Sequence, residues 1–132
     1  MAYWTFTRDI LEGKPIRVFN DGKLERDFTY IDDIVSGVVS VALDPAPAGQ
    51  PIHRIYNIGN NKPEKLLDFI RIIEQATGKK AQLQMAPMQP GDVLATYADI
   101  EALSRDYGFK PTTSLEEGIP RFVAWYREYV TG

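Results

Sequence analysis

The sequence predicts a small domain of mixed helices and strands, with an α/β or α+β layout. Segments with apolar residues at three- and four-residue spacing alternate along the chain with short segments rich in β-branched and aromatic residues. The 132 residues include 44% hydrophobic and 25% charged residues, as in an ordinary soluble globular protein. A chain of this length can bury a real core, and it suits one domain rather than two.

The first element is predicted to be a helix over residues 2–12. Tyr3, Phe6 and Ile10 fall on one face of this helix, and Gly13 is a natural C-terminal stop. No capping residue stands in front of the helix. We therefore expect that the domain has been cut from a longer chain.

The next segments are predicted to be a strand, a turn, an extended run and a helix, at 16–19, 20–22, 26–31 and 33–43. Asp32 is the expected N-cap of that helix, because its side chain can accept a hydrogen bond from a free amide of the first turn. Several prolines and a glycine predict a loop over 44–52.

In the second half, strands are predicted at 54–58 and 81–86. Helices are predicted at 63–76, at 99–107 and from Ser114 onward. Pro63 is expected to open the first of these helices and Asp99 to cap the second. Ser114 and Glu117 have the spacing of a capping box, and Pro120 is expected to kink the last helix.

Composition excludes several classes of function. The net charge is −3, from 15 basic and 18 acidic residues, which argues against nucleic acid as a partner. Cysteine is absent, so there are no disulfides or thiolate metal sites, and a reducing cytoplasm is expected. No apolar run is long enough to span a membrane. His53 is the only histidine, which excludes a multi-histidine metal site.

The sequence also lacks the common catalytic and cofactor motifs. It contains no Gly-x-Gly-x-x-Gly loop, no Walker loop and no tyrosine followed four positions later by lysine. No serine lies in a Gly-x-Ser-x-Gly elbow. We therefore assign no catalytic residue and no cofactor-binding residue to this chain.

One local feature is an arginine at the start of an extended run. Arg26 follows a turn and can present its planar guanidinium to a phosphate or carboxylate. The simpler alternative is a surface pair with Asp27 or Glu25, and chemistry alone favours that alternative. Asp27, Asp32 and Asp33 could form a cation site, although capping and solvation explain them more simply.

A second feature is the loop at 88–93, which Pro90 and Gly91 keep from regular structure. Such loops often present one polar side chain to a ligand. Asp92 could accept hydrogen bonds from sugar hydroxyls, and Gln89 could both donate and accept. The alternative is a plain turn.

Five motifs occur in an order that is characteristic of one family: Arg26–Asp33, Tyr56–Gly59, Pro90–Asp92, Tyr97–Asp99 and Gly108–Pro111. Over nearly all 132 residues, the chain resembles the carboxy-terminal part of extended short-chain dehydrogenase/reductases that act on nucleotide sugars. Within this superfamily it is most similar to the UDP-glucuronate 4-epimerases. The resemblance implies an α/β substrate-binding lobe with short strands and about five helices, detached from its Rossmann domain.

The resemblance also implies roles for individual residues. Arg26 would contact the substrate diphosphate, and Asp92 the uridine ribose. The strand at 16–19, around Val18 and Phe19, would lie beside the uracil. Gln89 stands where many relatives have arginine, which would weaken the positive charge on the diphosphate.

In that family NAD binds to an amino-terminal Rossmann domain, which also carries the Tyr-x-x-x-Lys pair. The implied partners are therefore a UDP-sugar and this missing domain, and the implied whole protein is a cytoplasmic 4-epimerase that serves capsular polysaccharide synthesis. Such an enzyme moves a hydride from sugar C4 to NAD and back, so we expect this chain alone to be inactive. A nucleotide-sugar 4,6-dehydratase and a stand-alone binding module remain alternatives.

Overall fold

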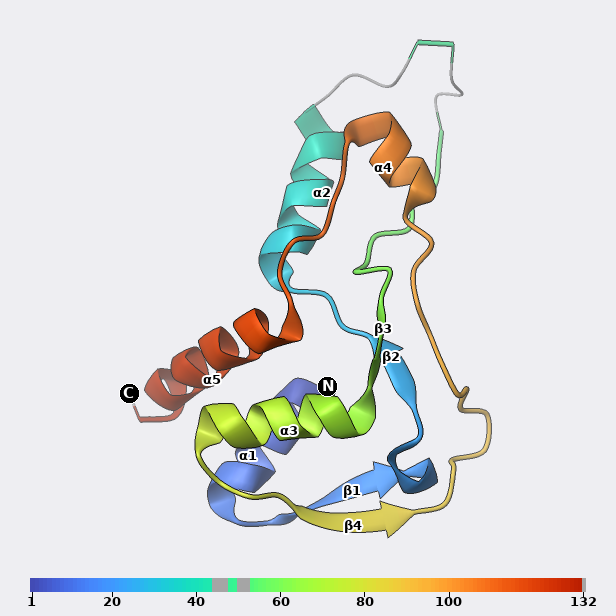
Figure 1. Cartoon of the computed structure of the whole chain (residues 1–132). Helices are drawn as coiled ribbons and strands as arrows, with labels where there is room; N and C mark the ends of the chain where they lie inside the picture. Colours follow the sequence, from blue (N-terminus) through green and yellow to red (C-terminus); the bar gives the residue numbers. More distant parts are fainter. Residues whose placement is uncertain (44–47, 50–52, 132) are drawn as a thin grey trace.

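A computed structural model describes residues 1–43, 48–49 and 53–131 (Figure 1). The helices and strands of this described part are, in chain order, α1 (Ala2–Glu12), β1 (Pro15–Phe19), the 3₁₀ turn η1 (Asn20–Gly22), β2 (Glu25–Asp27), α2 (Ile31–Leu43), β3 (Pro63–Lys65), α3 (Leu66–Thr77), β4 (Gln82–Ala86), α4 (Glu101–Tyr107) and α5 (Leu115–Thr131). This α/β arrangement matches the predicted fold class.

The strands pair across long sequence distances. Parallel strands β1 and β4 are in register from Pro15↔Gln82 to Phe19↔Ala86. Antiparallel strands β2 and β3 pair Glu25 with Lys65. Each sheet has two strands, so packing of side chains must supply most of the stability.

The larger part of the molecule is a body made of α1, β1, β4, α3 and α5. Figure 1 shows the three helices gathered on one side of the β1–β4 pair. Its core extends to Leu24, which lies between η1 and β2. The core is formed by the buried side chains of Ile10, Ile16, Val18, Leu24, Leu66, Phe69, Ile70, Ile72, Ile73, Leu115, Ile119 and Val123. Helix α3 contributes most to this core because its apolar residues recur at helical spacing.

The smaller part is an arm made of α2, the segment 53–61 and the segment 96–114 that contains α4 (Figure 1). Its core is small and consists of Ile100, Leu103 and Phe109, with Tyr56 and Ile58 packed against them. Helix α2 touches this core closely at Gly37. A Cβ atom built there would lie 2.9 Å from the Phe109 ring, so only glycine fits without movement.

Helix α2 buries little else. Asp33 and Gly37 are its buried residues. Apart from the half-buried Ile34, its large apolar residues are exposed; we call the exposed set the α2 apolar face, and it consists of Ile31, Val35, Val38, Val39, Val41 and Leu43. A contiguous apolar surface of this kind is unusual on an isolated soluble domain.

The structure confirms most of the predicted elements. The helix at 2–12 is α1, the strands at 16–19 and 81–86 are β1 and β4 to within one residue, and the turn at 20–22 is η1. The loop predicted at 44–52 lies outside the described residues except for a turn at 48–49. None of the helices in the described ranges combines the length and apolar character needed to cross a membrane.

The predicted strand at 54–58 is wrong. This segment alternates as a strand would, with Ile55 84% exposed and Tyr56 and Ile58 partly buried. It pairs with no other strand in the described structure, because its inward side chains pack on α4 instead.

Helix starts account for the other errors. Pro63 begins strand β3, a position where its missing N–H costs no ladder bond, and α3 starts at Leu66. The extended run at 26–31 ends early, because α2 already starts at Ile31 and places Asp32 inside its first turn.

The remaining caps are confirmed in part. The Asp99 carboxylate accepts a hydrogen bond from the Glu101 amide at 3.0 Å, at the start of α4. The Ser114 carbonyl accepts the first bond of α5, from Gly118. The Glu117 carboxylate pairs with Arg121 rather than closing a capping box. Helix α5 runs through Pro120 as one helix, and the kink stays a prediction.

Candidate functional site

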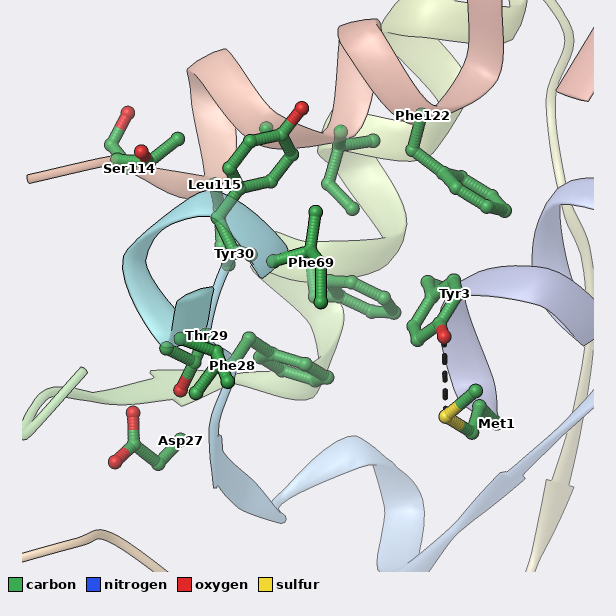
Figure 2. A pocket seen from close by; sticks show the side chains of 15 residues that line it. Met1, Tyr3, Asp27, Phe28, Thr29, Tyr30, Phe69, Ser114, Leu115 and Phe122 are labelled. Carbon is green, nitrogen blue, oxygen red and sulfur yellow. Dashed lines mark hydrogen bonds between the residues drawn. The ribbon is translucent and has the colours of Figure 1, made fainter. Parts of the chain in front are cut away.

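Two cavities on the surface of the described structure are candidate sites. The first, of about 450 Å³, is the aromatic cavity shown in Figure 2. Tyr3, Phe28, Tyr30 and Phe122 point into it, and the Phe28 and Phe69 rings stack at 4.2 Å between centroids. No basic side chain is among its described lining residues, so it is unsuited to a phosphate-bearing ligand.

The second cavity, of about 520 Å³, has a different chemistry. We call it the arginine cavity because both Arg17 and Arg26 line it, together with Phe19 and Asp92. An aromatic ring, two guanidinium groups and a carboxylate around one cavity can bind the base, the phosphates and the sugar hydroxyls of a nucleoside phosphate. Three of the residues singled out from the sequence therefore meet here.

Arg26 is fixed in place by both of its terminal nitrogens. Its Nη2 donates to Asp92 Oδ1 at 2.5 Å, and its Nη1 donates to the carbonyl oxygens of Glu25 and Leu94 at 2.7 and 3.4 Å. Its side chain is 25% exposed. The predicted surface pair with Asp27 or Glu25 side chains is therefore wrong, because the carboxylate partner of Arg26 is Asp92, which lies 66 positions away in the sequence.

The Asp92 loop is held against β2 by backbone hydrogen bonds. Glu25 donates its N–H to the Leu94 carbonyl at 2.8 Å and accepts from the Thr96 amide at 3.3 Å. The Asp92 carboxylate also accepts from the Val93 amide at 2.9 Å. These bonds explain how a segment with no strand of its own delivers Asp92 to the cavity.

Strand β1 supplies the aromatic wall. Alternation along the strand buries Ile16 and Val18 in the core and leaves Arg17 and Phe19 on the open face. Val18 is fully buried in the core and is not among the described residues that line the cavity. Arg17 was not singled out from the sequence, although the alternation of this strand could have placed it beside Phe19.

Gln89 lies apart from the other predicted site residues. Its side chain is exposed and is not among the described lining of the arginine cavity. Its carbonyl oxygen accepts a hydrogen bond from the Asp92 amide at 3.1 Å, within the turn at Pro90 and Gly91. Gln89 therefore shapes the turn that carries Asp92.

The acidic residues near Arg26 have structural partners. The Asp27 carboxylate accepts hydrogen bonds from the amides of Asn60, Asn61 and Ala98 at 2.9–3.1 Å. Asp32 is exposed. Over residues 1–43, 48–49 and 53–131, no group of acidic residues or His53 has the arrangement of a metal site.

Asp33 joins α2 to the segment that leads into α5. Its carboxylate accepts hydrogen bonds from the Thr112 and Thr113 amides at 3.1 and 3.0 Å, and from the Thr112 hydroxyl at 3.1 Å. Burial by itself would raise the pKa of Asp33. The hydrogen bonds from Thr113 and Thr112 outweigh burial and hold the pKa below its ordinary value of 3.8.

Asp106 plays the same part at α4. It accepts hydrogen bonds from the side chains of Arg105 and Tyr56, at 2.9 Å each, and forms an ion pair with Arg54. The Arg105 bond is the main cause that lowers the pKa of Asp106, and burial opposes it. These carboxylates organise the arm rather than a reaction.

Comparison with known proteins places this geometry in a family context. The model of the NAD dependent epimerase/dehydratase family matches residues 2–59. UDP-glucuronate 4-epimerase 4 of Arabidopsis thaliana is 43% identical over 145 residues, which cover 100% of this chain and 33% of that protein. Protein CapI of Staphylococcus aureus is 39% identical over 142 residues, which cover 98% of this chain and 42% of that protein.

A solved structure is similar in fold. The UDP-glucuronic acid 4-epimerase of Bacillus cereus, in complex with UDP-glucuronic acid and NAD, superposes with a TM-score of 0.87 at 32% identity. The match covers 98% of this chain and 40% of that one. The chain thus spans about two fifths of the length of such relatives.

Proposed function

This chain belongs to the NAD dependent epimerase/dehydratase family as a partial segment of an extended short-chain dehydrogenase/reductase, and we propose that it binds the nucleotide of a UDP-sugar in the arginine cavity. The proposed substrate of the whole protein is UDP-glucuronate, with epimerisation at C4 as the reaction. The observation that carries the proposal is the meeting of Arg26, Asp92 and Phe19 at one cavity.

Each of these residues has a role that suits its chemistry. The guanidinium of Arg26 is held by Asp92 and by two carbonyl groups, so it is oriented before a diphosphate arrives. Asp92 can accept hydrogen bonds from ribose hydroxyls through the carboxylate oxygen that does not bond Arg26. The half-buried Phe19 ring offers a face for the uracil.

The redox chemistry is proposed to lie outside this chain. The residues present do not fit NAD, because the sequence has no glycine-rich phosphate loop and no Tyr-x-x-x-Lys pair. When bound elsewhere in the whole protein, NAD would accept and return the C4 hydride. The contribution of this chain is to bind and orient the UDP, so that the sugar is held at the reacting position.

The α2 apolar face is proposed to pack against the NAD-binding domain of the whole protein. Support comes from exposed side chains such as Val35, Val38 and Val39, which are 49%, 55% and 45% exposed. The relatives are more than twice as long as the chain that they match, so they contain a further domain large enough to cover this face.

Calorimetric titration of the 132-residue chain with UDP tests the proposal. We expect weak but saturable binding, because a cavity of one lobe encloses only part of the nucleotide. The variant Arg26→Ala should abolish the heat signal. Arg71→Ala is the matched control, since Arg71 lies on the exposed surface of α3 and outside the cavity lining.

Absence of binding at millimolar UDP, or equal loss in both variants, would contradict the proposal. The affinities of the chain for UDP-glucuronate and for dTDP-glucose, measured in the same way, address the 4,6-dehydratase alternative. Tighter binding of the thymidine nucleotide would favour the dehydratase. Conversion of UDP-glucuronate by this chain with NAD would overturn the proposal that the redox residues lie elsewhere.

A further inference from the structure

A second arginine stands at the arginine cavity on the open face of β1. Pro15, Arg17 and Phe19 share that face, because Ile16 and Val18 point into the core. Arg17 and Phe19 both line the cavity, as does Arg26 on β2, the next strand along the chain. The side chain of Arg17 is exposed, so its charge is accessible to a ligand.

The charges around this cavity are unequally compensated. The charge of Arg26 is matched by Asp92 at 2.5 Å, and Asp9, which also lines the cavity, is matched by Arg8 at 2.8 Å. No carboxylate of the described residues forms an ion pair with Arg17. Arg17 is therefore a guanidinium at the cavity that no carboxylate of the described residues compensates.

A diphosphate carries several negative charges, and a guanidinium already paired with a carboxylate neutralises few of them. Gln89 lies outside the described lining of the cavity and adds no charge. We propose that Arg17 is a second anion-binding residue of this site and contacts the diphosphate together with Arg26. This inference rests on the proposed function and names a residue that the sequence motifs did not indicate.

The position of Arg17 is also favourable for capture of an anion. Its guanidinium carbon lies 5.2 Å from the centroid of the Phe19 ring, within the range of a cation–π contact. This contact restricts the long side chain at the rim of the cavity, so less conformational entropy is lost when a phosphate binds. Arg17 is thus held beside Phe19 at the rim of the cavity, with its guanidinium accessible to phosphates.

The test compares UDP, UMP and uridine in calorimetric titrations of the chain and two variants, at low and high salt. Arg17→Gln should weaken UDP binding roughly tenfold, leave uridine binding unchanged, and lower the salt dependence of UDP binding. Arg17→Lys should recover part of the loss, since it keeps the charge but not the planar fork. Arg71→Gln, which removes one exposed positive charge from α3, should change none of these affinities.

Three outcomes would overturn the proposal. Equal weakening of uridine and UDP by Arg17→Gln would mean that Arg17 stacks on the base instead. Unchanged UDP affinity in Arg17→Gln, with binding still lost in Arg26→Ala, would remove Arg17 from the site and leave the proposed function intact. Failure of the unchanged chain to bind UDP would remove both. Circular dichroism melts of each variant confirm that the fold is retained.

Discussion

The body and the arm of this molecule are stabilised by different interactions. The body packs three helices on a strand pair around a continuous apolar core. The arm has a core of three buried residues and relies on Asp33, Asp27 and Asp106, each of which accepts a hydrogen bond from a distant part of the chain. Apolar burial is non-directional, whereas these carboxylates fix individual backbone segments.

The difference is reflected in what each part exposes. Helix α3 of the body buries its apolar stripe, while α2 in the arm exposes its four valines. The arginine cavity lies where β1 of the body meets the β2 edge and the Asp92 loop. The proposed binding residues therefore lie in or beside the body, and the proposed docking surface lies on the arm.

The largest expected effect is loss of a core aromatic from the body. Phe69 is fully buried and stacks on Phe28, so Phe69→Ala should lower the free energy of unfolding by about 3–5 kcal/mol. Urea titration monitored by the fluorescence of Trp4 and Trp125, both in the body, measures it. The exposed Val38→Ala is the control, and a similar loss there would contradict the contrast between body and arm.

A smaller effect is expected when a carboxylate of the arm is removed. Asp33→Ala should cost about 2 kcal/mol, because it leaves the Thr112 and Thr113 amides without their acceptor. The adjacent, exposed Asp32→Ala is a matched control and should change stability little. Hydrogen exchange at the two threonine amides should speed up only in the Asp33 variant. Equal losses of stability in both variants would show that negative charge near the α2 N-terminus, and not the hydrogen bonds of Asp33, stabilises the arm.

The same carboxylate predicts a pH dependence. The folded pKa of Asp33 lies below 3.8, so its contribution is complete above that pH and is lost as the pH falls through the folded pKa. The pKa of Glu74 in the body is also lowered. Burial opposes this shift, but the hydrogen bonds from the Ala81 amide and the Lys80 side chain outweigh it. Glu74 therefore gives stability a pH dependence of the same sign. Denaturant titrations between pH 7 and 3 should show a flatter profile for Asp33→Asn. A profile parallel to that of the unchanged chain would exclude Asp33 as a source of the pH dependence of stability.

The smallest effect on stability is expected at the α2 apolar face. Substitution of Val35, Val38 and Val39 by serine should change the free energy of unfolding by less than about 1 kcal/mol, because these side chains are already solvated. Self-association and binding of a hydrophobic dye should fall in sedimentation and fluorescence measurements. Marked destabilisation would mean that the face is part of the fold rather than a docking surface.

Much of the body could be predicted from the sequence, and the arm much less. The helix at 2–12, the strand at 16–19 and the strand at 81–86 follow from local periodicity and from glycine stops such as Gly13, which adopts φ 70°. The segment 54–58 has the pattern of a strand, but it has no neighbouring strand to pair with. Local sequence indicates an extended backbone there, and only the surrounding chain decides whether a sheet forms.

The sequence by itself determined the periodic elements, the family motifs and the polar residues of the cavity, because these depend on spacing along the chain. Tertiary structure alone decided that Asp92 pairs with Arg26 across 66 positions and which face of β1 packs on the core, so that Val18 is buried and Arg17 and Phe19 lie on the open face. The physical reason is that charges and burial act through space. The partner of a charged side chain is therefore known only once the chain has folded.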